Sequence, residues 1–318
     1  MQLHGFHHLT AVSADARGNH DFYTRVLGMR LVKKTVNQDD VSAYHLFYAD
    51  GVASPGTDIT FFDFPTGRER RGTHAVVRTG LRVSGAAALA YWSERLEALG
   101  VARGRVQEAD GRQELAFEDP EGQRLALVDD GSSGPAHPWS GSPVPAAHQI
   151  GGLGPITMSV PELTPSDRFL TEVLAMRRVR EYAAPDAQDV TVQVYAMGDA
   201  GENGGAGAEL HVRVEPKLRA AQPGAGGVHH LAFRVRDEEY DYWVDRYRRL
   251  GIPSSGPVDR FYFRSLYARE PGGVLFEIAT EGPGFATDEP LETLGQSLSL
   301  PPFLEARRAS IERGLKPL

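Results

Sequence analysis

The alternation of apolar and polar positions predicts two closely similar strands, one at the start of the chain and one near its end. They read GFHHLTAV over residues 5–12 and GVHHLAF over residues 227–233. Each is followed by a segment with helical spacing that ends in Leu-Gly, over 19–28 and 238–251. Strand-like runs come next and close with a Pro-Gly turn and a last apolar strand. The two segments are therefore predicted to be copies of one strand-helix-strands unit.

Two further units with the same order lie between these copies. In one of them a strand over 78–83 precedes a helix over 86–99, and a turn leads into a closing strand over 124–128. The other is weaker, with a strand at 154–158 and a helix around 166–174. The chain is thus predicted to be an α+β protein of four related units in two paired halves.

A stretch rich in glycine, proline and serine separates the second unit from the third. It covers 131–145 and predicts an interdomain linker. We therefore expect a first pair of units over 1–130, a linker over 131–150, a second pair over 151–282, and a tail over 283–318 that contains a short amphipathic helix.

Composition narrows the class of protein. The 318 residues carry a formal net charge of -8 without a stripe of Lys and Arg, which argues against a nucleic-acid partner. No run is apolar enough to span a membrane, and we see no signal peptide, so a cytoplasmic location is expected. There is no cysteine, so a metal would have to be held by His, Asp or Glu. The oligomeric state is not defined by the sequence, which leaves a homo-oligomer open.

The His-His pairs at matching places in the first and last units predict a metal site. Successive side chains of a strand point to opposite faces. In the last unit Leu231, Phe233 and Val235 form the apolar face that should meet the helix, which puts His230 on the other face. The same parity places His8, and Glu277 of the closing strand, on the face that no helix covers.

Two histidines and one carboxylate on one side of a metal form the arrangement of non-haem Fe(II) oxygenases, which leaves coordination positions open for substrate and dioxygen. The alternative is that the two His-His pairs match by coincidence and the histidines are structural. If the first and last units share one site, the second and third units form the other half. There Thr79, Ile156 and Ala126 stand at the ligand positions, so we expect a metal-free support.

These motifs resemble those of the vicinal oxygen chelate superfamily, which includes glyoxalases, bleomycin resistance proteins and extradiol dioxygenases and is built from βαβββ units. Within it the chain is similar to ring-cleaving dioxygenases that act on hydroquinones, over its whole length and including LPPFLE at 300–305. The resemblance implies a concave mixed sheet with helices outside in each half. It also implies Fe(II) as cofactor, with Mn(II) as the alternative, held by His8, His230 and Glu277, and an aromatic diol and O2 as partners.

The resemblance further implies roles for His7, His229, Arg260 and Tyr267. Tyr267 would move a proton, His7 or His229 could do the same, and Arg260 would stabilise negative charge. Parity turns both histidines away from the metal, so they would act through neighbours or from strand ends, and capping the strands is the structural alternative. Arg260 and Tyr267 are seven residues apart, so a bend must intervene if both reach the substrate; nearby competitors are Tyr262, Arg264 and Arg269.

The expected activity is extradiol-type ring cleavage of a hydroquinone. One alternative is a glyoxalase-like isomerase or lyase, whose sites take a further carboxylate or amide from the closing strand of the partner unit. We align Phe61 or Phe62 with that position, and neither can bind a metal. The other alternative is a protein that binds an aromatic drug without catalysis. The remaining histidines without a matching partner are expected to be structural or on the surface, namely His20, His45, His74, His137, His148 and His211.

Overall fold

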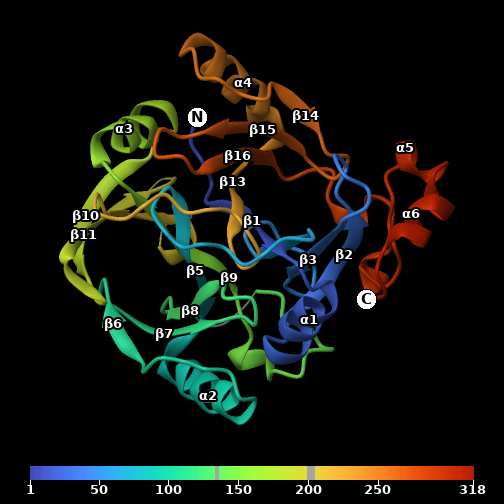
Figure 1. The fold of residues 1–318 in the computed structure, drawn as a ribbon, viewed down its shortest axis with the longest axis horizontal. Helices are drawn as coiled ribbons and strands as arrows, with labels where there is room; N and C mark the ends of the chain where they lie inside the picture. Colours follow the sequence, from blue (N-terminus) through green and yellow to red (C-terminus); the bar gives the residue numbers. More distant parts are fainter. Residues whose placement is uncertain (133–135, 199–204) are drawn as a thin grey trace.

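Two eight-stranded mixed sheets form the frame of the molecule (Figure 1). The structure is a computed structural model that describes residues 1–132, 136–198 and 205–318. Residues 133–135 of the predicted linker therefore lie outside the described part of the chain. The paired concave sheets predicted from the sequence are confirmed, with the helices on the outside.

The first sheet combines the first and last units of the chain. Its strands in spatial order are β14 (Pro257–Asp259), β15 (Arg264–Arg269), β16 (Leu275–Thr280), β13 (Val228–Val235), β1 (Phe6–Ser13), β4 (Asp58–Asp63), β3 (Tyr44–Ala49) and β2 (Arg30–Val36). At its centre β1 and β13 run antiparallel, and each is parallel to the closing strand of its own unit. The two units are thus joined edge to edge through their first strands.

The second sheet is built in the same way from the two middle units. Its order is β10 (Arg177–Ala184), β11 (Ala187–Ala196), β12 (Glu209–Val214), β9 (Gly152–Val160), β5 (Ala75–Val83), β8 (Arg124–Asp129), β7 (Arg112–Glu118) and β6 (Gln107–Ala109). Here β5 and β9 form the antiparallel central pair. Because each sheet takes one unit from either side of the linker, a site in the first sheet needs both ends of the chain.

One helix per unit packs against the outside of the sheets. These are α1 (Ala16–Asp21), α2 (Gly85–Ala98), α3 (Leu163–Arg168) and α4 (Tyr240–Arg249); α1 and α3 continue as π-helical turns over Phe22–Val26 and Phe169–Val173. The first helix begins earlier than predicted because the Asp15 side chain accepts a hydrogen bond from the N–H of Gly18. Gly100 follows α2 with a φ of +71°, a conformation that glycine adopts without strain.

The largest hydrophobic core among the described residues lies between the convex faces of the two sheets and the helices. It includes Leu9 and Leu231 from the first sheet and Leu81 and Ile156 from the second. The opposite, concave face of the first sheet carries the polar side chains that strand parity assigned to it. The core therefore leaves the concave face open for a site.

The C-terminal tail packs against the outer strand of the first sheet. It contains α5 (Pro302–Glu305) and α6 (Arg308–Gly314), which lie beside β2 in Figure 1. Lys33 of β2 is fully buried, and its ammonium group binds Asp288 at 2.7 Å as well as Glu289. A buried cation paired with two carboxylates thus anchors the tail on the sheet.

No helix of the described residues is long and apolar enough to cross a membrane.

Candidate metal and active site

His8 and His230 lie diagonally across the central strand pair of the first sheet. In the β1–β13 ladder His8 is opposite Ala232 and His230 is opposite Thr10, so the two imidazoles share one face and come from neighbouring rows. Ala232 is in turn opposite Glu277 on β16. The small Ala232 side chain between His8 and Glu277 leaves room for both to lean toward each other.

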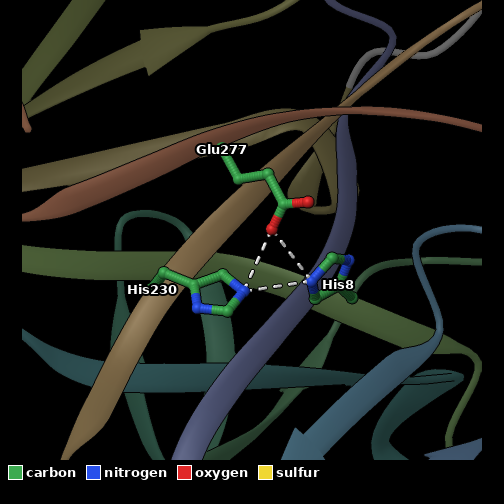
Figure 2. Close-up of side chains that lie close together, drawn as sticks. All are labelled: His8, His230 and Glu277. Carbon is green, nitrogen blue, oxygen red and sulfur yellow. Dashed lines mark hydrogen bonds and ion pairs between the residues drawn. The ribbon is translucent and has the colours of Figure 1, made fainter. Parts of the chain in front are cut away.

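The three side chains converge as Figure 2 shows. The Nε2 atoms of His8 and His230 are 3.3 and 3.0 Å from Oε2 of Glu277, and 3.2 Å from each other. All three residues are buried. Their ligand atoms lie within 4.8 Å of one another, as ligands of a single ion must.

The first histidine of each pair holds the second in position. Nδ1 of His7 is 2.8 Å from Nδ1 of His8, and His229 contacts His230 in the same way. Burial, and to a smaller extent the charge of the neighbouring histidine, lowers the pKa of His7 to about 3 and that of His229 to about 4. A neutral His7 or His229 can accept a hydrogen bond from Nδ1–H of the next imidazole, and that tautomer leaves its Nε2 lone pair free for a metal. His7 thus contacts the site through His8, one of the arrangements expected from parity, whereas His229 both contacts His230 and lines the cavity beside the ligands.

Ser265, which the sequence did not single out, orients the carboxylate. Its Oγ donates a hydrogen bond of 2.5 Å to Oε1 of Glu277. The other oxygen, Oε2, is buried and has no hydrogen-bond partner within the described part of the chain. Burial alone would raise the pKa of Glu277, but His8 and His230 hold it well below its usual range. An ionised, buried oxygen between two imidazole nitrogens fits a bound cation.

A cavity of about 300 Å³ opens beside these ligands. His8, His230 and His229 line it on one side, and aromatic rings form much of its wall, including Phe47, Phe62 and Phe263. Apolar walls with a few polar groups are typical of a site for a small aromatic molecule.

Arg260 and Tyr267 both line this cavity because the chain turns between them. Arg260 lies between β14 and β15, and the following Phe261 has a φ of +70°. Nε of Arg260 donates to the Tyr267 hydroxyl at 3.3 Å, and its Nη2 binds Asp39 at 3.0 Å. The bend required by their spacing is therefore present. Burial and then Glu277 raise the pKa of Tyr267 above its usual value, so the hydroxyl keeps its proton.

The three competing residues differ in position. Tyr262 also lines the cavity, but its hydroxyl donates to Asp288 of the tail. Arg264 donates to the carbonyl of Asp237, and Arg269 donates to the carbonyl of Gly273 and is exposed. Neither arginine lines the cavity.

His45 is also in the cavity wall, although the sequence assigned it a structural or surface position. Burial lowers its pKa well below the usual value, so the ring is neutral. A signal was present in the alternation of β3, because His45 and Phe47 share the face opposite the core residues Leu46 and Tyr48. Which cavity that face lines depends on strand order, which the alternation does not contain.

Strand register corrects one alignment made from the sequence. Ala232 faces Glu277 across β13 and β16, and Thr10 faces Thr60 across β1 and β4. Thr60, and neither Phe61 nor Phe62, is therefore the counterpart of Glu277 in the first unit. The inference is unchanged, because a threonine supplies no carboxylate for a fourth ligand.

The second sheet has a hollow of its own, of about 1170 Å³. Arg78 and Thr157 line it, whereas Thr79 and Ile156, which the sequence aligned with the ligands, do not. The alignment made from the sequence was therefore off by one residue on both strands, because Arg78 and Thr157 lie on the concave face and Thr79 and Ile156 lie on the opposite one. Arg78 forms two hydrogen bonds with Glu114, at 2.7 and 2.8 Å, so an ion pair occupies this face.

A second group of metal-ligand types lies on this sheet, comprising Asp110, Glu209 and His211. Both carboxylates are already paired with Arg180, and Glu209 also binds Arg112 at 2.6 Å. Two guanidinium groups neutralise the two carboxylates, which makes a dication unfavourable there. The first sheet therefore holds the better metal site.

Comparison with known proteins gives the same picture of the fold. The sequence model of the glyoxalase/bleomycin resistance protein/dioxygenase superfamily matches residues 5–127 and 152–278. MhqA of Bacillus subtilis (strain 168), named as a ring-cleaving dioxygenase, is 45% identical over 321 residues and all of both chains. The chlorohydroquinone/hydroquinone 1,2-dioxygenase of Sphingobium indicum is 31% identical, over 98% of this chain and 96% of its own.

A solved structure from Bacillus subtilis subsp. subtilis str. 168, described as a dioxygenase, superposes with a TM-score of 0.90. It is 35% identical and covers 100% of this chain and 98% of its own.

Proposed function

Because the chain belongs to the glyoxalase/bleomycin resistance protein/dioxygenase superfamily, we propose that it is an Fe(II)-dependent dioxygenase that cleaves the ring of a hydroquinone-type diol. The observation that carries the proposal is the meeting of Nε2 of His8, Nε2 of His230 and Oε2 of Glu277 at the edge of an aromatic cavity. The names of the relatives, one of which specifies hydroquinone, support the reaction class.

The donor set fits iron(II). Two imidazoles and one carboxylate form the facial triad of non-haem Fe(II) oxygenases. Carboxylate and imidazole donors also accept Mn(II), which is the alternative metal. Thr60 at the position related to Glu277 supports three protein ligands over the four of a glyoxalase-like site. When bound, iron(II) supplies open coordination positions and lowers the pKa of a coordinated hydroxyl.

The protein positions the ring and controls its protons. The rings of Phe62 and Phe263 lie tilted beside the ligand histidines and form walls along which an aromatic ring can pack. The oxygen of Tyr267 accepts a hydrogen bond from Arg260, so its own O–H is available to donate into the cavity. Arg260 stabilises negative charge that develops on the substrate oxygens. His229 lines the edge of the cavity and is a second group that could transfer a proton to or from the substrate.

The proposed reaction adds one O2 to one diol and releases nothing else. The bond that breaks joins a hydroxyl-bearing ring carbon to a neighbour without a hydroxyl, which makes the cleavage extradiol in type. The first carbon becomes a carboxylic acid and the second an aldehyde. Both oxygen atoms of O2 are then in the product, and the ring supplies the electrons that reduce them.

The test is oxygen uptake by protein loaded anaerobically with Fe(II), with hydroquinone and catechol assayed in parallel. We expect uptake with hydroquinone and little with catechol. Glu277→Gln should lose most of its iron and its activity, whereas Glu281→Gln, an exposed carboxylate just beyond β16, should keep both. The proposal fails if the loaded wild-type protein consumes no oxygen with any diol, or if Glu277→Gln retains full activity.

A further inference from the structure

His45 and Tyr267 line the same cavity from opposite halves of the first sheet. In the first sheet β15 is two strands from the centre on one side, and β3 is two strands from the centre on the other. The sheet curls (Figure 1), and these two strands lie on opposite sides of its central pair. Both side chains line the cavity. The cavity therefore receives polar groups from both halves of the sheet, with the candidate metal ligands on the strands between.

The ring of His45 is held from three directions. Its Nε2 is 2.9 Å from Oγ1 of Thr60, which is itself 2.8 Å from Oγ1 of Thr10. Its ring centroid is 3.9 Å from that of Phe47 and 4.3 Å from that of Phe62. Nδ1 of His45 has no hydrogen-bond partner among the described residues. The ring is thus fixed, with one nitrogen left for a ligand.

The last unit has a related contact at the equivalent positions. In the β15–β16 ladder Tyr267 is opposite Glu277. Ser265, two residues earlier on the same face of β15, donates a hydrogen bond to Glu277. The corresponding pair in the first unit is His45 and Thr60. The last unit uses this contact to orient a metal ligand. The first unit has no ligand at that position and uses the same contact to orient an imidazole.

We propose that Nδ1 of His45 binds the second hydroxyl of a para-diol whose first hydroxyl lies at the metal. The inference rests on the function proposed above and adds the residue that selects the substrate class. The centroid of the Phe62 ring is 4.3 Å from that of His45 and 6.3 Å from that of His230. A substrate ring packed along Phe62 therefore reaches toward both. A hydroxyl can donate or accept, and it pairs with Nδ1 in either tautomer.

The same geometry disfavours a catechol. Its second hydroxyl is adjacent to the first and stays near the metal, which leaves His45 without a partner. A site built to hydrogen-bond a hydroxyl rejects a ligand that places none there, because the polar group of the protein is then left unpaired.

The test is a comparison of binding affinities, independent of turnover. Protein loaded with Fe(II) is titrated without oxygen by calorimetry, with hydroquinone and with phenol, which lacks the second hydroxyl. Beyond the statistical factor for two equivalent hydroxyls, the wild type should bind hydroquinone about 5-fold or more tightly than phenol, as one neutral hydrogen bond provides. His45→Phe, which keeps an aromatic ring between Phe47 and Phe62, should lose this preference and bind phenol as the wild type does.

His45→Asn is the conservative variant, because its amide lies near the position of Nδ1 and should restore part of the preference. An unchanged preference in His45→Phe overturns the inference, and so does equal binding of the two ligands by the wild type. Failure of the wild type to bind either ligand overturns the proposed function, and this inference with it. If the Phe variant does not fold, His45→Leu takes its place, with the same expected loss of the preference.

Discussion

Ser265 donates a 2.5 Å hydrogen bond to Glu277 from the neighbouring strand, while His45 makes the related contact with Thr60 on the other side of the same sheet. The two contacts occupy equivalent registers of the two units. The first and last units thus carry the same strand-to-strand contact, one in each half of the sheet. One copy supports a carboxylate, and the other supports an imidazole.

Ser265→Ala should weaken metal binding by about 10- to 100-fold, because the carboxylate that it orients becomes free to rotate. The measurement is anaerobic competition for Fe(II) against a coloured chelator. Ser159→Ala is the matched control, because Ser159 is also buried and donates to a glutamate, Glu215, at 2.6 Å in the second sheet. Wild-type affinity in Ser265→Ala would contradict the role assigned to this serine.

Tyr267→Phe should lower the rate of oxygen uptake by about 10²- to 10⁴-fold, the range for loss of a general acid or base, and leave the iron content unchanged. Iron per chain and steady-state kinetics with hydroquinone measure the two effects separately. Tyr182→Phe removes a hydroxyl that contacts His211 in the second sheet and should leave the rate unchanged. If Tyr267→Phe keeps the wild-type rate, Tyr267 is not the proton donor.

Lys33→Met should destabilise the protein by about 3–5 kcal/mol, because Asp288 and Glu289 lose their buried cation. Urea unfolding measures the loss, and limited proteolysis should show earlier cleavage within 283–318. Lys34→Met is the control, since the Lys34 ammonium makes an exposed contact with the carbonyl of Gln296. Equal stability of the two variants would show that the Lys33 pairs do not anchor the tail.

Glu209→Gln should reduce the acid sensitivity of folding. Burial raises the pKa of Glu209, but contacts with His211, Arg180 and Arg112 outweigh it and leave the pKa well below normal. The unfolded state then binds more protons than the folded state in acid, so this contribution is present above about pH 4.3, the pKa of a free glutamate, and is lost as pH falls below it.

Urea unfolding between about pH 2.5 and pH 7 should therefore show a variant that is about 1–3 kcal/mol less stable at pH 7 and loses less stability on acidification. Glu108→Gln, which changes an exposed glutamate of β6, should follow the wild type within about 0.5 kcal/mol. A pH dependence in Glu209→Gln as steep as that of the wild type would contradict the assignment.

Much of the candidate site follows from patterns that are local in the sequence. The alternation of side chains along a strand depends on neighbouring residues alone, so it assigned His8, His230 and Glu277 to one face correctly. The repeated GxHHL pattern likewise predicted which units share a sheet. The bend between Arg260 and Tyr267 was expected from their spacing, although its form, with Phe261 at positive φ, was not.

The remaining features depend on which strands lie side by side and in which register, and a single sequence does not contain that information. Register made Thr60 the counterpart of Glu277 and brought Ser265 to its carboxylate. Strand order and the curl of the sheet brought His45 to the cavity. Local periodicity thus determined which face each side chain occupies. The packing of distant strands decided which of those faces meet, because that choice is set by the burial of a core shared by all four units.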